Sequence, residues 1–406
     1  MKRVWLISNL FIAPVILASS FSFAQKMPIA YYRAEAAFNQ NDFHNALIWI
    51  DSCLLLKPIR YEFYLLKGAS LLNLDSSKQA LDAFYKANKI RNNIASYYIA
   101  KTYCRLNDSS KCLEWIKINL NSIYREPESK YILDNDFSIL TNIKEWKETW
   151  EKDWYSSLEK DINHAEYLIN SKEYEKAIDL LNQRIRSKKS NSKLFLLRGT
   201  AHLKLRNINL ALKDLEIAQK RRKKDYSLIV LRAKAYLLID EYEKADKLID
   251  QAISYSGGKP EFYLIKSEIL SAKKEWENAY LNVKKYLDFY PNNPIANNLK
   301  IDCASEAGYY SEALLSLAKL LKLNPQNPEL YFKRGKIYYK AEQYREAILD
   351  FDKAIQLNYK VSESYLLKGK SLMNLGERKE ACKCFSISGN LGSLESKSIF
   401  LNSCIY

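Results

Sequence analysis

One small residue recurs along this chain at a spacing of 34 residues, apart from one interval of 32 and one of 65. The column reads Ala46, Ala80, Cys112, Ala177, Ala211, Ala245, Ala279, Ala313, Ala347 and Ala381. A large apolar residue follows each member four positions later, and a small residue precedes nine of the ten by twelve positions. A period of this length is the signature of a repeat array, in which each unit buries its apolar face only against its neighbours.

Each unit has the pattern of two short amphipathic helices joined by a polar turn. In the most regular unit, Pro328 opens the first helix, and the second places Ala347, Phe351 and Ala354 on one face. The small residues are expected where the two helices cross closely, with the large ones beside them. The 10 Gly and 9 Pro are too few for the turns of an all-β protein. The sequence therefore predicts an all-α fold: an α-solenoid of about ten helix-turn-helix repeats in two runs, with a C-terminal capping helix.

These columns resemble a known family. Tyr331, Gly335, Tyr338, Ala347 and Phe351 match the pattern of the tetratricopeptide repeat (TPR) as they stand. The resemblance covers residues 27–120 and 158–390 and is closest to the exported bacterial type. It implies a binding surface without chemistry of its own, since such arrays act almost wholly through the partners that they bind.

The N-terminal 24 residues have the layout of a secretory signal peptide. A basic start at Lys2 and Arg3 precedes an apolar run. The small residues Ser22 and Ala24 then form a predicted cleavage site before Gln25. The alternative is an uncleaved anchor helix. We expect residues 1–24 to be the signal peptide, 27–120 repeats 1–3, 121–157 a junction, 158–390 repeats 4–10, and 391–406 the capping helix.

The junction interrupts the repeat register and is rich in tryptophan. Ile143, Trp146, Trp150, Trp154 and Leu158 form a helical stripe in the sequence. It follows the segment 134–137, Asp-Asn-Asp-Phe, which resembles elements that close short repeat runs in exported TPR proteins. Either the tryptophans pack the joint between the two runs, or they form an exposed aromatic docking face.

No catalytic, metal or cofactor site is expected. The sequence has no nucleophile elbow, and its three His lie in different units without metal-ligand spacing. The cysteines have mainly the pattern of small core residues. Cys104 and Cys112 flank one predicted turn and could pair, and Cys404 could reach either Cys382 or Cys384.

Ligands of this family usually lie in the groove lined by the first helices of the repeats. Positions fifteen before the alanine column are expected to face it, and the residues four positions later edge it with charge. The predicted partner groove is formed by Tyr31, Leu65, Tyr97, Leu196, Val230, Leu264, Phe332 and Leu366, with Lys234, Lys336 and Lys370 among the charged edge residues. An apolar groove edged by charge suits an extended or helical protein segment. The alternative is that part of this apolar column is ordinary core between repeats.

Basic residues gather at the ends of two consecutive second helices. This basic edge comprises Arg184, Arg186, Lys188, Lys189, Lys220, Arg221, Arg222, Lys223 and Lys224. Cations suit helix C-termini, but such runs exceed that need, and the formal charge of the chain is +16. They indicate an anionic partner, either a membrane surface or an acidic protein; nucleic acid is disfavoured because the clusters lack interleaved aromatic residues.

Together these features predict a non-enzymatic scaffold in the periplasm or cell envelope, serving a secretion, motility or envelope-assembly complex. It would hold other proteins by binding their segments in the groove. The alternative is an exported glycan- or nutrient-binding repeat protein, whose aromatic platform would be Trp146, Trp150 and Trp154. A basic, membrane-apposed protein is a third possibility.

Overall fold

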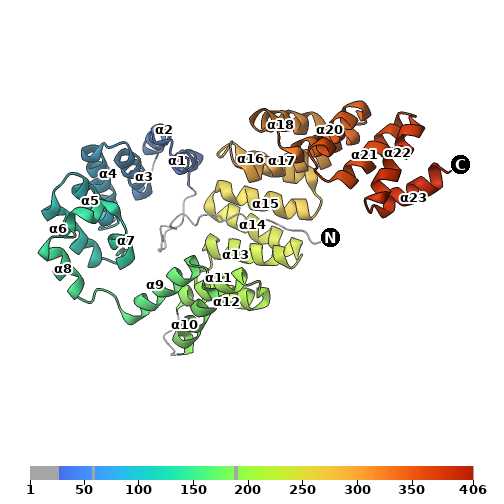
Figure 1. The fold of residues 1–406 in the computed structure, drawn as a ribbon. Helices are drawn as coiled ribbons and strands as arrows, with labels where there is room; N and C mark the ends of the chain where they lie inside the picture. The colour runs from blue at the N-terminus through green and yellow to red at the C-terminus, as the bar shows by residue number, and fades with distance from the viewer. Residues whose placement is uncertain (1–26, 57–59, 187–190, 406) are drawn as a thin grey trace. The chain divides into compact units, whose positions relative to one another are not determined.

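The computed structural model describes residues 27–56, 60–186 and 191–405, so the predicted signal peptide lies outside the described residues. Within these ranges the chain forms 23 α-helices, one 3-10 helix and no strand (Figure 1). The helices follow one another as ten hairpins plus a junction and a final helix, which confirms the predicted all-α repeat fold. We number the repeats 1 to 10 after their members of the alanine column.

The chain divides into two compact units, with the boundary between Ile269 and Leu270. The first unit contains repeats 1–3, the junction, repeats 4–6 and most of α15. Its hairpins are α1 (Ile29–Asn39) with α2 (Phe43–Leu54), α3 (Tyr61–Asn73) with α4 (Ser77–Ile90), α5 (Ser96–Arg105) with α6 (Ser109–Leu120), α9 (Ser157–Asn170) with α10 (Tyr174–Arg186), α11 (Ser192–Lys204) with α12 (Ile208–Arg221), and α13 (Tyr226–Leu238) with α14 (Tyr242–Ser256). The helix at the boundary is α15 (Pro260–Ala272).

The second unit contains the remaining helices. They are α16 (Trp276–Leu287), α17 (Pro294–Glu306), α18 (Tyr310–Leu323), α19 (Pro328–Lys340), α20 (Tyr344–Gln356), α21 (Val361–Asn374), α22 (Arg378–Asn390) and the final helix α23 (Leu394–Ser403). The longest described helix, α14, has 15 residues. None of the described helices is long and apolar enough to cross a membrane.

In four hairpins a glycine on the first helix meets a large residue on the second: Gly68 with Phe84, Gly199 with Leu215, Gly335 with Phe351, and Gly369 with Phe385. A Cβ built on Gly68 would lie 2.4 Å from the Phe84 ring, and one on Gly369 would lie 2.7 Å from Phe385. Both distances are too short for real atoms, so only glycine fits at these crossings. Their large partners are at most 1% exposed. The predicted role of the small and large columns is thereby confirmed.

The turn of every hairpin contains one residue in the left-handed backbone region, five positions before the alanine column. These residues are Asn41, Asp75, Asn107, Lys172, Arg206, Asp240, Lys274, Gly308, Glu342 and Gly376, with φ between 54° and 85°. Only two of the ten are glycine, although other residues adopt this conformation at a cost. Most repeats therefore keep some backbone strain in the same place.

The junction contains α7 (Glu128–Ile132), the 3-10 helix η1 (Asn135–Leu140) and α8 (Lys144–Glu151). The predicted continuous helical stripe is wrong beyond residue 151, because α8 ends there and α9 begins at Ser157. Ser156 and Glu159 form a capping box that starts the new helix. Trp154 consequently lies between two helices.

Two disulfides hold helices locally. Cys104 of α5 is bonded to Cys112 of α6 with a Cα–Cα distance of 5.3 Å. Cys404, just after α23, is bonded to Cys382 of α22 with a Cα–Cα distance of 5.7 Å. Cys384, also on α22, is a buried free cysteine of the apolar cluster against which Cys404 packs.

The helix crossing predicts the effect of one added methyl group. We expect Gly68→Ala to lower the free energy of unfolding by about 1–3 kcal/mol, because the new Cβ overpacks the site against Phe84. Adding Phe84→Leu should recover part of the loss, since repeat 5 already pairs Gly199 with Leu215 at a longer 3.0 Å. Urea unfolding followed by circular dichroism measures both effects. No rescue in the double variant would show that the ring contact is not the cause.

The turn conformation predicts opposite effects for two substitutions. Gly308→Ala should cost about 1 kcal/mol through backbone strain alone, since no atom lies within 4 Å of the added Cβ. Glu342→Gly should instead stabilise the protein by about 0.5 kcal/mol, because glycine adopts a φ of 60° without strain. Thermal unfolding midpoints of the two variants test this, and shifts of the same sign would contradict it.

Candidate protein-binding surface

The predicted groove column is largely core. Six of its eight side chains are only 3% to 8% exposed: Leu65, Tyr97, Val230, Leu264, Phe332 and Leu366. Tyr31 and Leu196 are half-buried. The reason is contact with the following element: the Phe332 ring, for example, lies 5.8 Å from that of Tyr359 and packs against Leu367. These residues shape the first-helix face, which is the face that the first helices of the repeats present beside this column. Charged residues four and eight positions later, such as Lys336 and Lys340, lie on the same face.

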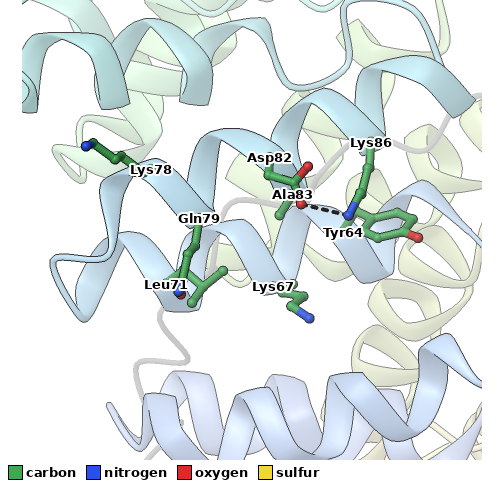
Figure 2. Close-up of a pocket in the computed structure, with 8 residues that line it drawn as sticks. All are labelled: Tyr64, Lys67, Leu71, Lys78, Gln79, Asp82, Ala83 and Lys86. Atoms are coloured by element: carbon green, nitrogen blue, oxygen red, sulfur yellow. Dashed lines mark hydrogen bonds and ion pairs between the residues drawn. The ribbon is translucent and has the colours of Figure 1, made fainter.

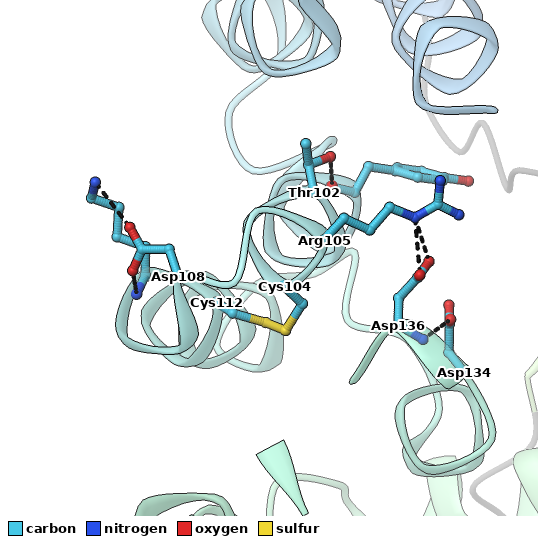
Figure 3. The surroundings of a disulfide bond; sticks show 9 residues. Thr102, Cys104, Arg105, Asp108, Cys112, Asp134 and Asp136 are labelled. Carbon is cyan, nitrogen blue, oxygen red and sulfur yellow. Dashed lines mark hydrogen bonds and ion pairs between the residues drawn. A yellow bond between two sulfur atoms is a disulfide. The ribbon is translucent and has the colours of Figure 1, made fainter. Parts of the chain in front are cut away.

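In repeat 3 this face is covered by the chain's own acidic segment. Lys101 forms ion pairs with Asp134 at 2.7 Å and with Asp136 at 3.0 Å. Arg105, one turn further along α5, donates from Nε to both carboxylate oxygens of Asp136 at 2.9 Å (Figure 3). The Tyr97 hydroxyl donates to Asp134 at 2.7 Å. An aromatic residue, a lysine and an arginine spaced by four thus hold two carboxylates spaced by two.

Charge and burial act in opposite directions on Asp134. Burial alone would raise the pKa of this carboxyl, but the hydrogen bonds donated by Lys101 and Tyr97 hold its pKa below the usual value. Burial and the hydrogen bond to Asp134 raise the pKa of Tyr97, so its hydroxyl stays a donor. The cluster is therefore built to keep the Asp134 carboxylate ionised.

A second lysine of the predicted groove, Lys234 in repeat 6, is matched by Glu268 in repeat 7. Burial lowers the pKa of Lys234, and the Glu268 charge opposes this effect. Burial likewise raises the pKa of Glu268, and Lys234 opposes that rise. The two half-buried groups thus compensate each other from the first helices of neighbouring repeats.

A third lysine, Lys370 in repeat 10, is matched by the final helix. Its Nζ lies 2.5 Å from Glu395 of α23. The disulfide Cys382–Cys404 and hydrogen bonds from Arg378 to the Ser403 carbonyl fasten the same helix. The capping helix thereby carries a carboxylate to the first-helix face.

The fourth, Lys336 in repeat 9, has a different environment. It is exposed, and its Nζ lies 5.8 Å from the centre of the Phe332 ring. Among the described residues, no carboxylate forms an ion pair with it. Lys336 is therefore an uncompensated cation on this face.

The basic edge is partly engaged within the chain. Arg184 pairs with Asp161, Lys220 with Glu216, and Arg222 with Asp225. Arg186, Lys223 and Lys224 are exposed, Arg221 is exposed but has an interaction within the chain, and Lys188 and Lys189 lie outside the described residues. Their predicted binding role stays a prediction.

The junction tryptophans do not form an exposed platform, and that interpretation is wrong. Trp146 is 8% exposed and belongs to a core cluster, against which Trp150 and Trp154 pack. The Trp150 ring contacts Tyr131 and Trp146, and Trp154 donates its indole N–H to the Thr149 carbonyl. The rings instead pack within the junction and against repeat 3, because the cluster contains residues of α5, α6 and the junction.

The comparisons with known proteins agree with this architecture. Two family models described as tetratricopeptide repeats match residues 328–358 and 362–386, and one described as a TPR repeat matches residues 306–342. The chain is a tetratricopeptide-repeat protein. Repeats of this family are typically protein-interaction modules without enzymatic activity, so this TPR protein is a protein–protein interaction scaffold.

Solved structures similar to this TPR protein are other repeat proteins. A tetratricopeptide repeat protein from Parabacteroides merdae is 19% identical, with 60% of this chain and 96% of that chain covered and a TM-score of 0.44. The C-terminal part of a TPR repeat-containing protein from Cytophaga hutchinsonii is 15% identical, with 58% and 98% covered and a TM-score of 0.49. These likenesses are too distant to carry an argument about function. No curated protein matches the chain.

The tetratricopeptide register also explains the junction. Trp146 lies 34 residues after Cys112, in the alanine column, and Trp150 takes the large position four residues later. The junction is thus a degenerate repeat, with α7 and η1 in place of a first helix and α8 in place of a second. The spacing was visible in the sequence, but two large rings at these positions hid it.

A pocket of about 570 Å³ between α3 and α4 is a weaker candidate (Figure 2). It is lined by Tyr64, Lys67, Leu71, Lys78, Gln79, Asp82, Ala83 and Lys86. Two of its lysines are already compensated, since Lys67 pairs with Asp51 and Lys86 with Asp82, each at 2.7 Å. Its polar groups do not converge on one point, so the first-helix face remains the better candidate for binding.

The binding of Asp134 and Asp136 by Tyr97, Lys101 and Arg105, which we call the α5 clamp, predicts a pH-dependent effect on stability. Asp134→Asn should lower the free energy of unfolding by about 1 kcal/mol at pH 7, because the ion pair with Lys101 is lost. A carboxyl with a lowered folded pKa stabilises above its unfolded pKa of about 3.9 and loses that effect as pH falls through the folded value. The deficit of the variant should therefore shrink between pH 7 and pH 3.

Asp153→Asn is the matched control for this measurement. Asp153 belongs to the same junction and pairs with Lys160 at 2.9 Å, but its side chain is 68% exposed. Urea midpoints of the wild type and both variants at the two pH values give the comparison. Equal deficits in both variants would mean that only the change in net charge matters.

Proposed function

We propose that this TPR protein is an exported adaptor that holds other cell-envelope proteins together by binding segments of them on its first-helix face. The observation that carries the export proposal is the pair of disulfides, Cys104–Cys112 and Cys382–Cys404. Such bonds persist in oxidising compartments such as the periplasm and are rare in the cytosol. The signal-peptide pattern of residues 1–24 supports the same location.

The first-helix face favours a protein segment as the ligand. Its apolar column is packed, so the accessible groups are charged and polar residues arranged along successive helices. Such a surface can bind an extended segment through ion pairs and hydrogen bonds, with little rearrangement of its own. A complex for secretion, motility or envelope assembly is the setting that the resemblance to exported TPR proteins implies.

Export predicts a defined covalent state of the protein in cells. The mature chain should begin at Gln25 and contain two disulfides, while Cys53, Cys303 and Cys384 should react with an alkylating reagent only after unfolding, because they are buried. Intact-mass and peptide mass spectrometry of protein trapped with acid and alkylated check this. A fully reduced chain that keeps residues 1–24 would contradict export.

The adaptor role is tested by crosslinking in cells followed by affinity purification of the full chain. Envelope and soluble fractions are kept apart, and recovery is quantified against a chain with an unrelated tag. Stoichiometric recovery of the same envelope proteins in repeated experiments is the expected result. Recovery of the chain alone would overturn the adaptor role.

A further inference from the structure

We propose that Lys336, Lys340 and Lys370 bind an acidic segment of a partner protein, in which two Asp carboxylates are separated by one residue. This inference rests on the proposed adaptor function and names the kind of partner segment that it needs. It follows from a comparison of Lys336 with the lysines at the same position in other repeats, each of which has a carboxylate of the chain beside it.

Four repeats carry a lysine eleven positions before the alanine column: Lys101, Lys234, Lys336 and Lys370. Three of them are matched by a carboxylate from a following segment. Asp134 and Asp136 match Lys101, Glu268 matches Lys234, and Glu395 matches Lys370. Lys336 is the exception, because the equivalent residue of the following repeat is Lys370.

The acidic residues around Lys336 are engaged with other cations. Asp302 pairs with Lys333 at 3.2 Å, and Glu306 pairs with Lys340 at 2.6 Å. Glu363 pairs with Lys360 at 3.3 Å. The chain therefore places one more cation than carboxylate on this part of the face.

The α5 clamp shows which ligand binds to a first helix that carries an aromatic residue followed by two cations at four-residue spacing. Tyr97, Lys101 and Arg105 have the same spacing as Phe332, Lys336 and Lys340, and no other repeat has an aromatic residue followed by two cations at these positions. On α5 the chain supplies two carboxylates spaced by two, which bind at 2.7 to 3.0 Å. Among the described residues, no carboxylate of the chain pairs with Lys336 in the way that Asp134 and Asp136 pair with Lys101. The geometry therefore points to carboxylates from another molecule.

The pairs that now compensate Lys340 and Lys370 can be exchanged. Glu306 and Glu395 have side chains that are 45% and 58% exposed. Exposed ion pairs contribute little to stability, so a ligand carboxylate can replace them at small cost. Glu306 and Glu395 remain as exposed carboxylates beside Lys340 and Lys370, so a broad anionic membrane surface would also meet negative charge here.

The test uses a fluorescein-labelled peptide that reproduces residues 131–139 of this chain, and the full mature protein. Fluorescence polarisation should show saturable binding that weakens with salt. A peptide with both Asp replaced by Asn should bind at least tenfold more weakly. Lys336→Glu should weaken binding of the acidic peptide at least tenfold, because it adds a repelling carboxylate where a cation stood.

Lys319→Glu is the matched control, since Lys319 is exposed on α18, a second helix, in the same compact unit. It changes the net charge equally and should alter binding less than twofold. Equal losses in both variants, or no binding by the wild type, would overturn the proposal. Vesicles of anionic phospholipid that bind with the same dependence on Lys336, in place of the peptide, would also overturn it.

The failure of this inference can be told apart from failure of the adaptor role. Equal recovery of crosslinked partners by the wild type and Lys336→Glu would support the adaptor function and contradict the proposed binding site at Lys336, Lys340 and Lys370. If the wild type recovers no partner, the adaptor function itself falls, whatever the peptide does.

Discussion

The close crossing of the two helices in each repeat is the constraint on which the rest of the structure depends. Where Gly68 meets Phe84 or Gly369 meets Phe385, the backbone of one helix touches a ring of the other, and a Cβ has no room. This contact sets the distance between the helices and therefore the surface that the next hairpin must cover. Since the contact recurs in register, a local rule of packing produces successive hairpins. Contacts across the array add to it, because the Tyr32 hydroxyl donates to the Ser256 carbonyl and Glu35 pairs with Lys259.

That locality explains what the sequence can and cannot predict. The helices, their crossings and the repeat family follow from spacing alone, because every contact involved joins positions at a fixed separation. Spacing leaves both Cys382 and Cys384 open as partners of Cys404, and only the structure assigns the bond to Cys382. The ion pairs of Lys101 with Asp134 and Asp136 join a regular helix to an irregular segment, for which no periodic signal exists. Spacing also places the groove column on the first helices, but it does not tell which neighbour covers each residue, and six of the eight residues are buried.

The first helices divide their residues between two tasks. The apolar column packs successive repeats together. The charged residues four and eight positions later set the charge of the first-helix face. Where the chain continues irregularly, as at the junction and the final helix, its own carboxylates occupy these positions. The chain thus compensates Lys101 and Lys370 from these segments, while Lys336 has no ion pair with a carboxylate of the described residues.

The disulfide between Cys382 and Cys404 has a mechanical consequence. A linear array of repeats loosens most easily from its ends, where a hairpin has only one neighbour. Here the last hairpin and the helix behind it are joined covalently, so under tension that helix cannot peel away from the C-terminal side while the bond is intact. A scaffold pulled between two anchored partners would therefore resist at its C-terminal end more than an end without such a bond does. The last hairpin and α23 would stay joined until the Cys382–Cys404 bond is reduced.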